Sequence, residues 1–192
     1  MNQELVLRLP DGSEKRVAPG TTPRAVAQSI GPGLARAAVA ARLDGQIVEL
    51  DRPLEAPGPF EILTDKSPDA LFVLRHSAAH VLATAVRRLF PGAGIGFGPP
   101  IEDGFYYDFD VPRPFTPEDL EKIEAEMQAV VAADYKIERE VVSRAEATKR
   151  FAADPLKLER LAEIPDGETI SVYRDGPFED LCRGPHLAAT GR

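Results

Sequence analysis

The chain has 192 residues, including three histidines and one cysteine, and a formal net charge of -8 at pH 7. This acidic balance argues against a protein that holds nucleic acid by its overall field, so any RNA contact has to be local or come from another domain. No apolar run approaches the roughly 20 residues that a membrane span needs, and the start of the chain has no signal-peptide pattern, so we expect no membrane contact and a cytoplasmic location.

Residues 1–64 are predicted to form a small domain of their own. Alternating apolar and polar residues over 5–17, interrupted by Pro-Asp-Gly-Ser, indicate a hairpin. A helix over 22–31 follows, with a threonine cap and a terminal glycine. A second hairpin over 38–50 and a strand over 60–63 complete the unit. This order is compatible with a β-grasp sheet that carries one helix, and the lack of clustered reactive side chains favours a binding or spacing role.

A second domain over 65–192 is expected to open with a long helix between Ser67 and Gly92. Apolar residues at three- and four-residue steps predict the face that packs on the core, namely Leu71, Leu74, Ala78, Leu82, Ala85 and Leu89. His76 and His80 lie one turn apart on the opposite side. Their small neighbours suggest the wall of a pocket, and the alternative is two histidines on a wet surface.

The rest of the second domain is predicted to contain strands and further helices, which makes the chain an α+β protein. A glycine-rich segment over 92–98 lacks both common nucleotide-binding motifs, so it should permit close packing or the close approach of a substrate. The elements expected after it are a strand over 105–110, an acidic helix from Thr116, a strand over 135–142, helices over 144–151 and 155–164, and a hairpin over 169–182.

Two polar side chains in these elements are open to two interpretations. Tyr107 follows the aromatic row of its strand, but its hydroxyl needs a partner and can contact a nucleotide. Lys157 falls in the first turn of a helix, where the helix dipole does not stabilise it. From the sequence alone, a lysine on a wet surface is the better interpretation.

All the histidines and the cysteine fall in two short motifs, H-x-x-x-H at His76 and His80 and C-x-x-x-H at Cys182 and His186. The economical interpretation is one site assembled by folding. These four groups form a plausible zinc ligand set, structural if all four bind and catalytic if three bind. Ser77 stands where a metalloprotease needs its glutamate. A metal-free hydrolytic pocket and, with less support, a cysteine nucleophile stay open.

Several motifs resemble known families. L-P-D-G-S at the first turn resembles the TGS domain, a ubiquitin-like module of threonyl-tRNA synthetases, some GTPases and alarmone enzymes. H-S-A-A-H, G-F-Y-Y-D and D-L-C-R-G-P-H resemble the editing domain of bacterial threonyl-tRNA synthetases, which follows a TGS domain. The resemblance covers essentially the whole chain, and R-G-P-H distinguishes it from the alanyl-type editing domains.

The resemblance implies hydrolysis of serine wrongly esterified to threonine tRNA. The catalytic residues that it implies are His76, His80, Lys157, Cys182 and His186. The substrate-binding residues that it implies are Tyr107, Asp180 and Arg183. No metal is required under this hypothesis, although zinc is possible at the histidines and the cysteine. The expected partners are the mischarged tRNA and the synthetase core and anticodon-binding domains, which the sequence lacks, so we expect no aminoacylation.

Two other functions are compatible with the sequence. One is a non-catalytic RNA-binding module in which His76, His80, Cys182 and His186 hold a structural zinc. The other is a small esterase that acts on free esters, which the TGS-like unit argues against. The chain is interpreted as either a fragment of a synthetase or a free-standing editing protein.

Overall fold

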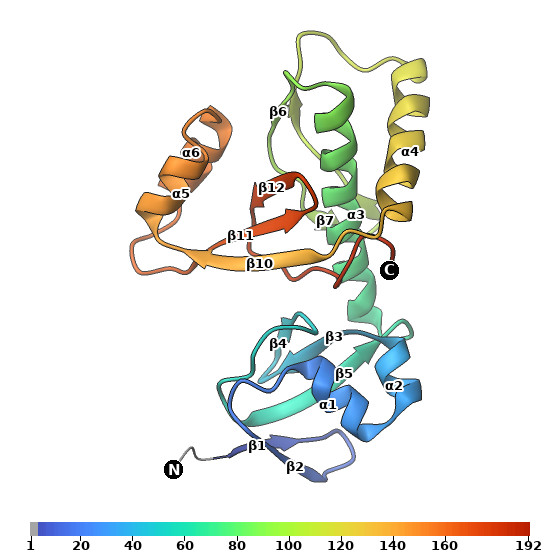
Figure 1. Cartoon of the computed structure of the whole chain (residues 1–192), viewed down its shortest axis with the longest axis vertical. Coiled ribbons are helices and arrows are strands. Elements are labelled where there is room, and N and C mark those ends of the chain that lie inside the picture. The colour runs from blue at the N-terminus through green and yellow to red at the C-terminus, as the bar shows by residue number, and fades with distance from the viewer. Residues whose placement is uncertain (1–3) are drawn as a thin grey trace. The chain divides into compact units, whose positions relative to one another are not determined.

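The computed structural model describes residues 4–192, which form a mixed α/β structure (Figure 1). The backbone divides into two compact units. One ends at Leu74 and also takes in Pro185–Ala188, and the other consists of Arg75–Gly184 and Ala189–Arg192. The predicted α+β class is confirmed, whereas the domain boundary expected after residue 64 stays a prediction. Within the described residues, no helix has the length and apolar composition of a membrane span.

The first unit contains a five-stranded sheet with the strand order β2-β1-β5-β3-β4. Strands β1 and β5 are parallel, and the other neighbours are antiparallel. Its elements are β1 (Leu5–Arg8), β2 (Glu14–Val17), α1 (Pro23–Ile30), α2 (Pro32–Ala37), β3 (Ala38–Leu43), β4 (Gln46–Val48) and β5 (Gly58–Thr64). This topology confirms the β-grasp prediction, and α2 is a short helix that the sequence pattern did not predict.

Local signals explain how this unit folds. The Thr22 hydroxyl accepts a hydrogen bond from the backbone N–H of Ala25, so it caps α1 as predicted. Gly12 takes a φ of +84°, a left-handed conformation that the turn between β1 and β2 requires. Leu7, Val26 and other apolar side chains from the sheet and α1 form the core.

The second unit is built around a three-stranded antiparallel sheet with the order β10-β11-β12 and two small two-stranded sheets, β6-β9 and β7-β8. Its elements, together with the long helix α3 that leads into it, are α3 (Pro68–Leu89), β6 (Gly94–Ile95), β7 (Pro100–Ile101), β8 (Gly104–Phe105), β9 (Phe109–Asp110), α4 (Pro117–Ala132), β10 (Ile137–Val142), α5 (Arg144–Arg150), α6 (Pro155–Ala162), β11 (Ile170–Asp175) and β12 (Phe178–Leu181). A reciprocal capping box of Thr116 and Asp119 starts α4.

The single strand predicted over 105–110 is wrong. Strand β8 ends at Phe105 and β9 begins at Phe109, because β8 pairs with β7 and β9 with β6. Between them, the Asp108 backbone is hydrogen-bonded in both directions to the segment that follows β6, through Gly96 N and Phe97 O. The alternation of aromatic residues therefore continues through a change of strand partner.

The core-facing side predicted for α3 is also wrong in part. Three members of the predicted apolar stripe are exposed: Leu71, Leu74 and Leu89. The buried side includes His80, whose ring lies edge-on to the rings of Tyr173 and Phe178, with centroid distances of 6.5 and 6.0 Å. Sheet β10-β11-β12 thus packs on the histidine side, where small residues of α3 leave room for it.

Candidate active site

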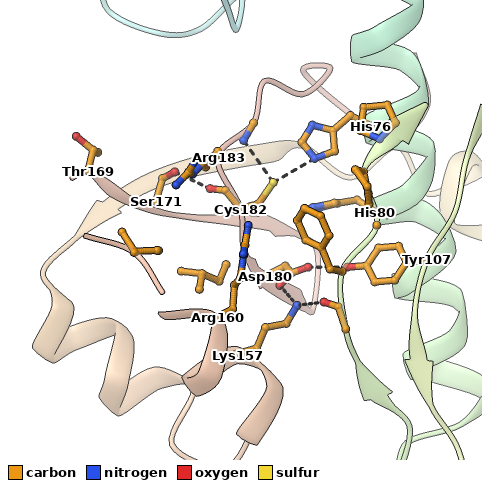
Figure 2. Close-up of a pocket in the computed structure, with 18 residues that line it drawn as sticks. His76, His80, Tyr107, Lys157, Arg160, Thr169, Ser171, Asp180, Cys182 and Arg183 are labelled. Atoms are coloured by element: carbon orange, nitrogen blue, oxygen red, sulfur yellow. Dashed lines mark hydrogen bonds and ion pairs between the residues drawn. The ribbon is translucent and has the colours of Figure 1, made fainter. Parts of the chain in front are cut away.

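A cavity of about 230 Å³ lies in the second unit (Figure 2). It is lined by α3, the segment between β6 and β7, the segment between β8 and β9, α6, the start of β11 and the end of β12. The predicted site residues His76, His80, Tyr107, Lys157, Asp180, Cys182 and Arg183 all line it. Folding therefore gathers side chains that are as much as 107 positions apart, from 76 to 183, around one cavity.

The two histidines of α3 form one wall of this cavity. Their rings lie edge-on with centroids 5.7 Å apart, as expected for positions one helical turn apart. His80 is buried, and its burial lowers its pKa well below the ordinary value, with smaller contributions from His76 and Lys157. The His80 imidazole is therefore neutral near pH 7.

The floor of the cavity is a chain of three polar side chains. Lys157 Nζ lies 2.5 Å from Asp180 Oδ1 and donates a hydrogen bond to Gly96 O at 2.9 Å. Tyr107 donates its phenolic hydrogen to Asp180 Oδ2 at 2.8 Å. Burial and the Asp180 charge raise the Tyr107 pKa well above its ordinary value, so the phenol stays protonated.

Lys157 is one of the buried polar residues, so the interpretation of a lysine on a wet surface is wrong. Its position follows from the start of α6, where the Asp154 carboxylate accepts a hydrogen bond from the Lys157 backbone N–H at 3.2 Å and Pro155 occupies the first turn. A lysine side chain in the first turn can reach Asp180, which lies on β12. This ion pair supplies the charge compensation that a buried ammonium group requires.

Cys182 lies at the end of the sheet beside the histidine wall. Its Sγ is 3.3 Å from His76 Nε2 and accepts a hydrogen bond from Gly184 N at 3.3 Å. Burial raises the Cys182 pKa to about 12, partly offset by the Gly184 hydrogen bond. The thiol is therefore protonated near pH 7, which argues against its use as a nucleophile, because the thiolate is the reactive form.

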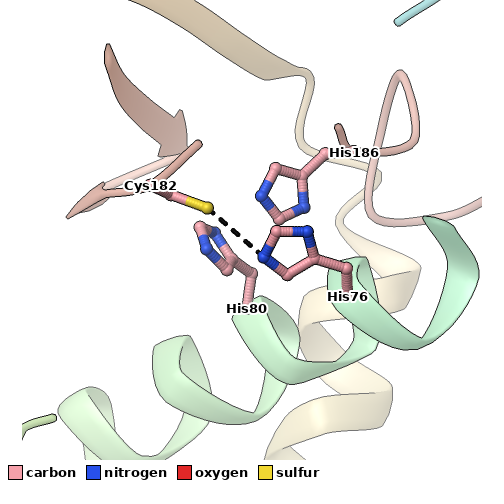
Figure 3. Close-up of side chains that lie close together, drawn as sticks. All are labelled: His76, His80, Cys182 and His186. Carbon is pink, nitrogen blue, oxygen red and sulfur yellow. Dashed lines mark hydrogen bonds between the residues drawn. The ribbon is translucent and has the colours of Figure 1, made fainter. Parts of the chain in front are cut away.

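His76, His80, Cys182 and His186 each offer one ligand atom, and these four atoms lie within 4.8 Å of one another (Figure 3). A tetrahedral zinc site places neighbouring ligand atoms about 3.3 to 3.6 Å apart, given zinc–nitrogen and zinc–sulfur distances of about 2.0 to 2.3 Å. The pair of Cys182 and His76 already has this spacing. The donor set fits zinc once the wider pairs approach by about 1 Å.

Arg183 lies at the outer edge of the cavity. Its guanidinium group is exposed and pairs with Glu168 at 3.0 Å. The predicted contact between Arg183 and the substrate stays a prediction, as do the catalytic roles of the other residues.

Comparison with known proteins gives these residues a context. The TGS domain family matches residues 6–64. A threonine--tRNA ligase of Pelobacter propionicus is 53% identical over 188 residues, which are 97% of this chain and 29% of that relative. Threonine--tRNA ligases of Rubrobacter xylanophilus and Methylibium petroleiphilum are each 49% identical, over 97% and 98% of this chain. The chain is homologous to the N-terminal region of threonine--tRNA ligases.

The chain spans less than a third of the length of these ligase relatives, with 29% covered in the Pelobacter protein. The activity and substrates of the whole ligases therefore come to this chain only as proposals. The homology nevertheless confirms the family resemblance drawn from the histidine and cysteine motifs.

Some residues that shape the cavity have no sequence motif that predicts their role. A methyl group on Gly98 would lie 2.1 Å from Tyr107 Cδ2, so only glycine allows the tyrosine ring its position. The alternating glycines had indicated close packing without indicating the partner. Phe97, Arg160 and Ser171 also line the cavity, and only their positions in space reveal it.

Proposed function

We propose that the chain hydrolyses serine that has been esterified to threonine tRNA, and so acts as a proofreading deacylase. The observation that carries this proposal is the cavity in which two histidines face the buried group of Lys157, Asp180 and Tyr107. The homology to threonine--tRNA ligases supplies the amino acid and the tRNA.

The chemical need for such a site follows from the difference between the two amino acids. Serine lacks only one methyl group of threonine, and one such group changes binding by about 1 to 3 kcal/mol. A synthetic pocket for threonine therefore cannot strongly exclude serine. A second pocket that admits serine and rejects the larger side chain removes the error.

The cavity offers groups that match a seryl ester. Lys157 supplies N–H donors and Asp180 a carboxylate acceptor, a complementary pair for a hydroxyl or an amino group. The Tyr107 ring is packed against Gly98, so it limits the space beside that pair. These three residues bind and size the amino acid under this proposal, and Cys182 closes the cavity beside His76.

In the proposed reaction, a water molecule attacks the ester carbonyl carbon and the acyl–oxygen bond breaks. Serine leaves as its carboxylic acid and the tRNA regains its terminal hydroxyl, so the proton that the water loses is returned to the ribose oxygen. His76 positions the water and accepts its proton, because burial lowers the pKa of His80 too far for that imidazole to serve as the base. The vicinal hydroxyl of the tRNA can assist in the transfer.

The direct test is deacylation of seryl and threonyl threonine tRNA by the 192-residue chain. We expect release of serine but little threonine, and a loss of about 10²- to 10⁴-fold in rate for His76→Ala, the range for removal of a proton-transfer group. Leu71→Ala changes an exposed residue of the same helix that does not line the cavity, and it should leave the rate unchanged. A wild-type chain that releases serine no faster than buffer does would refute the proposal.

The four clustered ligand atoms favour a second candidate, an RNA-binding module with a structural zinc at His76, His80, Cys182 and His186. When bound, zinc would link these side chains and, with an open position, polarise a carbonyl group. Metal analysis of the purified chain and deacylation in chelator separate the candidates. One zinc per chain without any deacylation supports the binding module, and full activity in chelator supports the metal-free deacylase.

A further inference from the structure

The cavity has a buried floor and an exposed outer part. Asp180 and Lys157 on the floor are 3% and 5% exposed, whereas the Phe97 residue at the outer part is 50% exposed. The Arg160 side chain beside it is 46% exposed. Since floor and outer part belong to one cavity, a ligand with its amino-acid side chain on the floor extends past Phe97 and Arg160.

The size of the cavity supports this direction. Its volume of about 230 Å³ is below the roughly 300 to 1,000 Å³ of pockets that enclose drug-sized ligands. An aminoacyl group fits such a space, but the nucleoside to which it is esterified does not fit with it. The nucleoside has to lie at the outer part.

Phe97 and Arg160 there form a defined pair. The Arg160 guanidinium carbon lies 4.9 Å from the centroid of the Phe97 ring, within the range of a cation–π interaction. The backbone of Phe97 is fixed, because its carbonyl accepts a hydrogen bond from Asp108 N at 3.0 Å. Arg160 also pairs with Glu163, one helical turn further on. The aromatic ring is therefore held half-exposed at the outer part of a polar cavity.

We propose that Phe97 and Arg160 form a stacking platform for the nucleobase next to the scissile ester. The identity of the ligand rests on the proposed function. Aromatic rings and guanidinium planes are the groups on which proteins stack unpaired bases. The net charge of -8 argues against binding the phosphates through the overall field of the chain, and stacking is a local contact that does not depend on that field.

Two non-hydrolysable probes test this proposal without phosphate groups. One is 3'-seryl-amino-3'-deoxyadenosine, and the other is the same seryl amide with hydrogen in place of the base. By calorimetric or NMR titration, we expect the wild-type chain to bind the base-bearing probe about 5- to 150-fold more tightly, the range that base–aromatic stacking supports. Phe97→Ala should remove most of this difference and leave binding of the base-free probe unchanged.

Matched variants separate stacking from charge and from general damage. Arg160→Lys keeps the positive charge but loses the planar group, so it should weaken binding of the base-bearing probe only. Tyr106→Ala and Arg174→Ala change an exposed aromatic and an exposed arginine that do not line the cavity, and neither should alter binding.

Equal binding of the two probes by the wild-type chain, or no binding of either, would overturn the platform. So would a Phe97→Ala chain that keeps the full preference for the base. If the chain hydrolyses seryl-tRNA but binds the two probes equally, only the proposed stacking platform is refuted. Conversely, if the chain binds the base-bearing probe more tightly but does not hydrolyse seryl-tRNA, the platform is supported and the proposed function is refuted.

Discussion

Asp175 is a fully buried carboxyl group on β11 that faces Thr84 of α3. Thr84 Oγ1 lies 3.2 and 3.0 Å from the two Asp175 oxygens and 2.9 Å from the carbonyl oxygen of His80. The hydroxyl has one hydrogen for these three acceptors. A protonated Asp175 supplies a second hydrogen, so Asp175 can donate to Thr84 while Thr84 donates to His80.

Burial raises the Asp175 pKa from 3.8 to about 7, and the Asp180 charge adds to this shift while the Thr84 hydrogen bond opposes it. The folded chain therefore binds more protons than the unfolded chain between pH 3.8 and about 7. The contribution of Asp175 to stability is fully present below pH 3.8, declines across this window and is lost above pH 7. A shift of about 3 units corresponds to at most roughly 4 kcal/mol.

Asp175→Asn should remove this dependence, because its amide group donates to Thr84 as the protonated carboxyl does and does not ionise. We expect urea unfolding to give similar stabilities for the two chains near pH 4.5, and a variant more stable by about 1 to 4 kcal/mol at pH 8. The quantity to follow is the difference between the chains, since other groups titrate in both.

Thr84→Ser is the matched control, because it retains the hydroxyl and should retain the wild-type pH dependence. A difference between Asp175→Asn and wild type that stays constant from pH 4.5 to pH 8 would show that Asp175 is ionised throughout. The inference that a protonated Asp175 donates a hydrogen bond to Thr84 would then be wrong.

Three further predictions concern the cavity and the helix α6 that carries Lys157. Lys157→Met leaves the Asp180 charge buried without its cation, so it should lower the free energy of unfolding in urea by about 3 to 5 kcal/mol. Adding Asp180→Asn should restore most of this loss. If the losses of the two single variants simply add in the double variant, the two residues are not a coupled pair. Gly98→Ala has to displace the Tyr107 ring, so the deacylation rate should fall more than tenfold while the TGS-like unit stays folded. An unchanged rate would show that deacylation does not need this position of the ring. Asp154→Ala removes the cap of α6 and should cost about 1 kcal/mol in unfolding free energy, whereas Asp154→Asn, which can still cap, should cost little.

The parts of the fold that the sequence predicted well depend on local chemistry. Thr22, Thr116 and Ser143 each accept a hydrogen bond from a backbone N–H three residues later, so the cap and the start of the helix lie in the same few residues. The strands over 105–110 were mispredicted because their pairing partners lie elsewhere in the chain. Alternation along one segment does not reveal a change of partner.

The same limit explains the error on α3. Leucines at helical spacing predicted the buried face, but the sheet packs on the face with alanines, valines and His80. Small side chains bury little apolar area each, yet they let a strand approach closely. Which face is covered therefore depends on the shape of the sheet, and spacing within the helix does not contain that information.

The histidine and cysteine motifs could be joined from the sequence because they hold all of these rare residue types. Lys157 could not be placed in the same way, since its partner Asp180 lies 23 positions further along the chain. Buried ion pairs contribute little net stability, because desolvation offsets their attraction, and apolar side chains of similar volume serve the core as well or better. The value of this pair is then chemical, since it presents a donor and an acceptor to whatever enters the cavity. This is why the double variant that combines Lys157→Met with Asp180→Asn should regain stability without regaining deacylation.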